Sequence, residues 1–132
     1  MRIGIDAVHI SRNQKGVGRV ERNIIQILSE ATYSHEFVVF LDRDPSELSL
    51  PQGDSLSYSV NKSNSLIEWE QIRLSRAARK HKIDCLLTLS DRVPLLYSGQ
   101  IVLYLFEIPD RRRELSLDSK VAGLYQRTSD NL

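Results

Sequence analysis

The chain has 132 residues, with 18 Lys+Arg against 17 Asp+Glu and a net charge of +1. This length suits one domain with a sizeable core and is short for a two-domain enzyme. The balanced charge provides no basic field, so we expect no nucleic-acid partner. A single cysteine excludes an internal disulfide, and the longest apolar run, residues 101–106, is far too short to cross a bilayer. We therefore expect a cytoplasmic protein, either free or peripheral at the inner membrane face.

The first twenty residues predict a strand, a loop and the start of a helix. The strand covers residues 2–6 and ends in the carboxylate of Asp6, and further on Gly16 and Gly18 open the helix. Backbone N–H groups in the first turn of a helix lack intrahelical partners and the dipole end is positive, so this junction can attract an anion. Gly16 and Gly18 can take positive φ and let a ligand approach, and Arg19 adds a cation suited to phosphate or paired hydroxyls. The spacing matches neither the full dinucleotide fingerprint nor a P-loop, so an ordinary flexible connection remains the alternative.

Changes of hydrophobic period predict the remaining elements. Apolar residues at helical spacing indicate a helix over residues 18–31, and a continuous apolar run indicates a strand over 37–41. Residues 42–57 contain Pro45, Pro51 and Gly53 and indicate a loop, followed by a short edge strand over 57–60. We expect a second helix over residues 65–82, buried strands over 84–89 and 100–105, and a last helix over 117–128.

The alternation of strands and helices predicts an α/β fold, a Rossmann-like three-layer domain with a mainly parallel sheet. We expect the strands near residues 2, 37, 84 and 100 to lie parallel, with the first strand central and helices on both faces. Ligands gather at the carboxyl ends of such strands, which here are residues 6–18, 89–94 and 106–113. The loop of residues 8–15 borders this edge and offers little to bury, so we expect it to be mobile without a ligand.

Glu70 is out of place in the second predicted helix, because at 100° per residue it falls on the apolar arc of that helix. A carboxylate among apolar neighbours is costly unless it is paired or reaches a rim. Two interpretations stay open: an ion pair with Arg73 or a neighbouring element, or a polar role facing a ligand cleft. Trp69, at the margin of the arc, is expected to lie in the core rather than to stack on a sugar.

Five segments of the chain share their order and spacing with one known family. They are MRIGID at residues 1–6, GVGRV at 16–20, FVVFLD at 37–42, EWEQIRL at 68–74 and IDCLLTLSDRVPL at 83–95. Together they resemble the N-terminal domain of the family 4 retaining glycosyltransferases, which have the GT-B fold of two facing Rossmann-like domains. The resemblance covers nearly the whole chain and treats residues 1–132 as a single N-terminal, acceptor-side domain.

The resemblance implies transfer of a sugar from a nucleotide-sugar cosubstrate to a glycan, lipid or small-molecule acceptor, with no required metal. A C-terminal domain would bind the nucleotide-sugar, and the glycine loop near the donor diphosphate and the acceptor corresponds to Gly16, Gly18 and Arg19. Where the family has His-Asp near the transferred sugar, this chain has Phe106 and Glu107. Phenylalanine can neither donate a hydrogen bond nor carry a proton, whereas Glu107 keeps a carboxylate, either for the site or for a solvated loop.

Four residues are therefore candidates for the ligand cleft: Asp6, Glu70, Phe106 and Glu107. A noncatalytic sugar- or partner-binding domain on the same scaffold is the alternative function, and Phe106 favours it. The 132 residues do not include the donor domain of the resembled enzymes, so we expect no glycosyl transfer by this chain alone. We also expect self-association through the edge of the strand at residues 101–105, because unpaired apolar edges recruit other chains.

Overall fold

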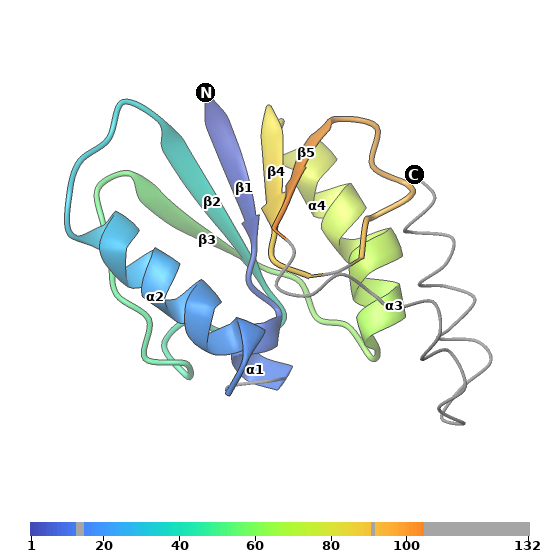
Figure 1. Ribbon diagram of the computed structural model, residues 1–132, viewed down its shortest axis with the longest axis horizontal. Helices are drawn as coiled ribbons and strands as arrows, with labels where there is room; N and C mark the ends of the chain where they lie inside the picture. Colours follow the sequence, from blue (N-terminus) through green and yellow to red (C-terminus); the bar gives the residue numbers. More distant parts are fainter. Residues whose placement is uncertain (13–14, 91, 105–132) are drawn as a thin grey trace.

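A parallel five-stranded sheet with helices on both faces makes up the domain (Figure 1). The computed structural model describes residues 1–12, 15–90 and 92–104. The strands are β1 (Arg2–Asp6), β2 (Glu36–Leu41), β3 (Leu56–Val60), β4 (Cys85–Thr88) and β5 (Gln100–Leu103). Their order is β3-β2-β1-β4-β5, and every neighbouring pair is parallel. The predicted α/β fold class is confirmed, with β1 central and β3 at an edge.

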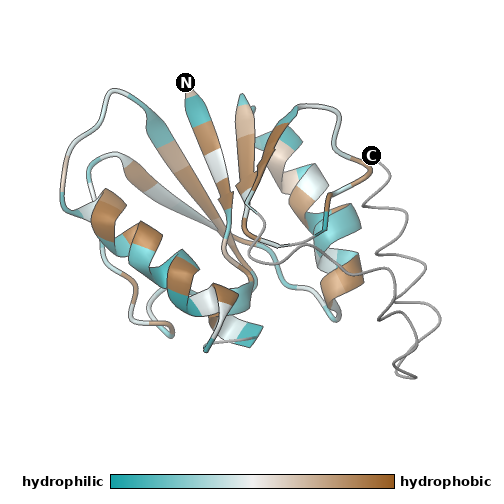
Figure 2. Ribbon diagram, in the orientation of Figure 1, coloured by the Kyte–Doolittle hydropathy of each residue, from teal (hydrophilic) through white to brown (hydrophobic). Residues whose placement is uncertain are grey.

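One face of the sheet is covered by α2 (Val17–Ser29), the helix that follows the glycine loop. Its apolar stripe packs Ile24, Ile25 and Leu28 on a cluster that includes Ile5 of β1 and Val39 of β2. Figure 2 shows apolar residues along the strands and in bands on α2, as expected for a helix with one buried face. This side of the core fixes the position of the helix start relative to the end of β1.

The other face is covered by one continuous helical segment between β3 and β4. It consists of α3 (Leu66–Glu68), a π-helical turn η1 (Trp69–Arg73) and α4 (Leu74–Lys80), all within the helix predicted over residues 65–82. In the π turn the N–H of Leu74 bonds to the carbonyl of Trp69, five residues earlier, which inserts one extra residue into the turn. As a result the adjacent residues Trp69 and Glu70 are both buried.

Because of the π turn, the buried face of this helix differs from the one that a regular helical period predicts. Ile67, placed on the apolar arc by a regular 3.6-residue period, is 40% exposed, whereas Trp69, placed at its margin, is 0% exposed. Trp69 belongs to a core cluster with Phe40, Leu74 and Leu86, which confirms that its ring is core.

Gly4 lets this core approach β1 closely. A Cβ at this position would lie 2.8 Å from Cε2 of Phe40, closer than real Cβ atoms come, and 3.0 Å from Cγ2 of Ile83, closer than most do. The space that a side chain at Gly4 would occupy is therefore taken by Phe40 of the neighbouring strand and by Ile83, which precedes β4.

The segment between β1 and α2 includes residues 8–15, which we expected to offer little to bury and to be mobile without a ligand. It contains a short helix, α1 (His9–Arg12), in which Ile10 is buried. Ser11 donates to Asp42, and Arg12 contacts Asp42 with 2.8 Å between Nε and Oδ2. The expectation that this loop offers little to bury is therefore wrong for residues 9–12, while residues 13 and 14 lie outside the described part of the chain.

The β5 side of the sheet is less covered than the β2 side. Ile101 packs against the core, but Val102 and Tyr104, on the opposite side of the strand, are 53% and 55% exposed. The predicted helix over residues 117–128, together with Phe106 and Glu107, lies outside the described residues. None of the helices described here is long and apolar enough to span a membrane.

Candidate functional site

The carboxyl ends of β1 and β4 meet where the order of the strands reverses. From β1 the chain moves through α2 to β2 and β3 on one side, and then returns to β4 on the other side. In open α/β sheets the crevice at such a switch point is the preferred place for a ligand. In Figure 1 this edge faces downward, with α1 beneath it and the starts of α2 and α3 on its two sides.

Asp6 ends β1 in the middle of this edge and is buried. Its Oδ1 accepts a hydrogen bond from the indole N–H of Trp69 at 2.9 Å and one from the backbone N–H of Val8 at 3.3 Å. Burial raises the pKa of Asp6, although the charge of His9 and hydrogen bonds from Trp69, Val8 and Thr88 act in the opposite direction. Asp6 thus joins β1 to the π turn and to the end of β4.

Glu21 lies on the buried side of α2 and reaches back to α1. Its Oε1 is 2.9 Å from Nδ1 of His9, and its Oε2 accepts from the backbone N–H of Ile10 at 3.1 Å. Burial raises the pKa of Glu21 to about 7, while the hydrogen bond from His9 limits the shift. Burial lowers the pKa of His9, but the hydrogen bond and the charge of Glu21, followed by the charges of Asp6 and Glu70, raise it above its usual value.

Glu70 projects from the π turn toward the loop after β4. Ser90 Oγ donates to its Oε1 at 3.3 Å, and Arg92 Nη1 lies 4.0 Å from its Oε2. The pairing with Arg73 that we considered is wrong, because Arg73 pairs with Glu68 at 2.8 Å between Nη2 and Oε1. The ion pair with a neighbouring element, the other form of that interpretation, is the one present.

The charges of three buried carboxylates from three elements therefore act on His9, which contacts the second of them directly: Asp6 from β1, Glu21 from α2 and Glu70 from η1. Such a group can exchange hydrogen bonds with hydroxyls and can hold a proton near neutral pH. Within residues 1–12, 15–90 and 92–104, no group of His, Cys, Asp and Glu side chains is placed to hold a metal ion.

The glycine loop is brought to the same edge. Gly16 is the N-cap of α2, with φ of −112° and ψ of −111°, and no side-chain hydrogen bond caps this helix start among the described residues. Gly18 is buried and Arg19 is exposed. No described glycine has a positive φ, so the left-handed freedom that we expected at Gly16 and Gly18 is not used.

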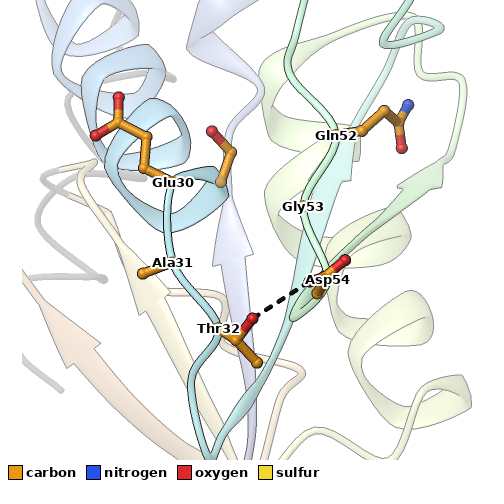
Figure 3. Close-up of a pocket in the computed structure, with 7 residues that line it drawn as sticks. Glu30, Ala31, Thr32, Gln52, Gly53 and Asp54 are labelled. Atoms are coloured by element: carbon orange, nitrogen blue, oxygen red, sulfur yellow. Dashed lines mark hydrogen bonds between the residues drawn. The ribbon is translucent and has the colours of Figure 1, made fainter.

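A hollow of about 480 Å³ lies at the opposite edge of the sheet (Figure 3). It is lined by Ser29, Glu30, Ala31, Thr32, Gln52, Gly53 and Asp54. These residues follow α2 and precede β3, so the hollow is at the amino ends of the strands, and Thr32 donates across it to Asp54 at 3.3 Å. Because it is open and far from the switch point, we do not take it as the functional site.

Sequence reasoning identified Asp6, Glu70 and the helix start, but it missed His9 and Glu21. Glu21 stands four residues after Val17 and four before Ile25, so it lies on the apolar stripe of α2. The criterion that identified Glu70 would have identified it as well. His9 gave no such signal, because its partner is 12 residues away.

Comparisons of the chain with family models, with curated proteins and with solved structures found no match.

Proposed function

We propose that this chain is the acceptor-side domain of a retaining glycosyltransferase. It binds a glycan, lipid or small-molecule acceptor at the carboxyl edge of β1 and β4 and works opposite a domain that binds the nucleotide-sugar. The observation that carries the proposal is the buried polar network of Asp6, Glu21 and Glu70 at the switch point, beside the open start of α2.

The network supports a sugar ligand because its groups match hydroxyl chemistry. Carboxylates accept hydrogen bonds, whereas Ser90 and His9 can both donate and accept. Burying three carboxylates opposes folding unless each has partners. A polar cluster kept at this edge, where a ligand would sit, therefore fits a binding role better than a purely structural one.

The start of α2 supports the transfer step. Its first-turn N–H groups and the guanidinium of Arg19 can neutralise a departing diphosphate from the acceptor side. Holding donor and acceptor in one geometry supplies the rest of the catalysis in this proposal. The nucleotide-sugar is a cosubstrate, and the proposal includes no metal.

A noncatalytic sugar- or partner-binding domain is the second candidate. It is favoured by Phe106, which stands where the resembled family has a histidine near the transferred sugar. The two candidates predict the same binding edge and differ only in turnover.

Titration by ¹H–¹⁵N NMR tests both candidates. Monosaccharides and nucleotide-sugars are added separately, and we expect shifts of the Gly16 and Gly18 amides and of the Trp69 indole N–H. The variant Arg19→Ala should weaken nucleotide-sugar binding, whereas the exposed Arg76→Ala on α4 serves as the matched control. Sugar transfer after addition of a donor-binding domain supports the enzyme, and binding without transfer supports the binding module.

The proposal would be overturned if no sugar shifted these amides. It would also be overturned if all shifts were confined to the hollow around Gly53, at the opposite edge of the sheet.

A further inference from the structure

We propose that His9 is a ligand-contacting residue of this site, and that its imidazole Nε2 binds a hydroxyl group of the acceptor while Glu21 holds the ring in place. This inference rests on the proposed function and adds one specific contact to it. Glu21 is a positioning residue in this arrangement, because it acts on the ligand only through His9.

The ring of His9 is fixed from one side. Nδ1 lies 2.9 Å from Oε1 of Glu21, and the second oxygen of the same carboxylate is held by the N–H of Ile10. Above about pH 7, where Glu21 is ionised, its carboxylate only accepts hydrogen bonds, and Nδ1 is then assigned as the donor. The orientation and the tautomer of the ring are therefore set by a group on another helix, as in other carboxylate–histidine pairs.

The other ring nitrogen of His9, Nε2, takes no part in this contact. Among the described residues Nε2 has no hydrogen-bond partner, and the side chain is 12% exposed. The buried side-chain atoms without a partner in the described part of the chain do not include Nε2 of His9, so this nitrogen reaches solvent and is open to a ligand. An Nε2 with limited access to solvent and no protein partner is suited to a ligand.

The surroundings of His9 place it inside the switch point rather than on an outer face. The charges of Asp6 at the end of β1, Glu21 on α2 and Glu70 on η1 all act on its ring. Glu70 is in turn 4.0 Å from Nη1 of Arg92. In Figure 1 these elements lie near the carboxyl edge of β1 and β4. A ligand at this edge would therefore lie within reach of the ring.

The chemistry of the cluster favours a hydroxyl over an anion. Three neighbouring carboxylates repel a phosphate or carboxylate group, whereas a hydroxyl can donate to neutral Nε2 or accept from the charged ring. The neighbouring charges raise the pKa of His9, so the ring keeps its proton to a higher pH than usual and can serve as a donor. A sugar acceptor has hydroxyls that suit either state.

Long-range ¹H–¹⁵N NMR of the imidazole nitrogens tests this contact directly. The chain has three histidines, and His35 and His81 serve as internal controls because they lie near the amino ends of β2 and β4. On addition of glucose, galactose, mannose or N-acetylglucosamine, we expect Nε2 of His9 to shift while the other two rings stay unchanged. His9→Phe should weaken the same sugar about tenfold, the loss for one hydrogen bond of about 1.4 kcal/mol, and His35→Phe should not.

The outcomes separate this inference from the proposed function. If sugars shift the Gly16 and Gly18 amides but leave Nε2 of His9 unchanged, the contact is refuted and the proposed function stands. If no sugar shifts any signal, both are refuted. Should His9→Phe fail to fold, as judged by Trp69 fluorescence, the Nε2 signal of the wild-type protein decides.

Discussion

Replacing Glu21 with glutamine should change how the stability of the protein depends on pH. The raised pKa of Glu21 means that the folded state holds a proton that the unfolded chain releases at lower pH. Stability from this group is therefore complete below the unfolded value of 4.5 and is lost as the pH rises through about 7. The pKa values of His9 and Asp6 are also raised, so both groups act in the same direction.

The size of the effect follows from the two pKa values. The difference between 4.5 and about 7 corresponds to about 3 kcal/mol in the free energy of unfolding. Glu21→Gln removes this titration and also lowers the pKa of His9, so the variant should lose most of the pH dependence. Near the acidic end it should be less stable than the wild type, because the NH2 group of the amide replaces one of the two oxygens that face His9 and Ile10 and cannot accept a hydrogen bond.

Urea unfolding followed by fluorescence measures this prediction, since Trp69 is the single tryptophan and is fully buried. The free energy of unfolding is compared between about pH 5 and about pH 8 for the wild type, Glu21→Gln and Glu30→Gln. Glu30 is an exposed carboxylate at the end of the same helix and should leave the wild-type slope intact. A wild-type stability that stays constant or rises over this range would refute the reasoning, as would parallel slopes for Glu21→Gln and the wild type.

Three further predictions concern packing, the Asp6 hydrogen bond and association. Gly4→Ala should lower the free energy of unfolding by about 1–3 kcal/mol, because the added methyl meets the core, and urea unfolding with an unchanged midpoint would contradict this. Trp69→Phe keeps an aromatic ring but removes the donor to Asp6, which should lower the free energy of unfolding by about 1–3 kcal/mol. Because this variant has no tryptophan, its unfolding is followed by circular dichroism. A stability equal to that of the wild type would argue against the hydrogen bond. Through the edge of β5, the last strand among the described residues, the protein should self-associate in light scattering. Val102→Lys should reduce the association, because Val102 is 53% exposed. A wild-type protein that stays monomeric at high concentration would remove this edge as an interface.

The fold could be predicted from the sequence because its signals are local. Continuous apolar runs marked the strands, and the 3.6-residue period marked α2 to within two residues at each end. The phase of the helix before α4 could not be predicted in this way, because a regular period cannot show where a π turn inserts a residue. Around this insertion Trp69, predicted at the margin of the apolar arc, is fully buried, and Ile67, predicted on the arc, is 40% exposed.

The site could be predicted only in part for a similar reason. Asp6 and the start of α2 follow from the rule that ligands bind at the carboxyl ends of parallel strands. The partners that hold α1 in place could not be inferred, since Glu21 is 12 residues from His9 and Asp42 is 30 residues from Arg12. Such pairs form only when the chain is folded, and no pattern within one element indicates them.

The extra residue of the π turn matters more for the contacts of the candidate site than for the core of the fold. Deleting one residue between positions 69 and 73 would turn η1 into a regular helix while Leu74, Ala77 and Ala78 stay seated in the core. The part of the helix that precedes the deleted residue would rotate by about 100° about the helix axis relative to α4. This rotation would carry the indole of Trp69 away from Asp6. A deletion of one residue can therefore remove the hydrogen bond between Trp69 and Asp6 while the core contacts of α4 remain.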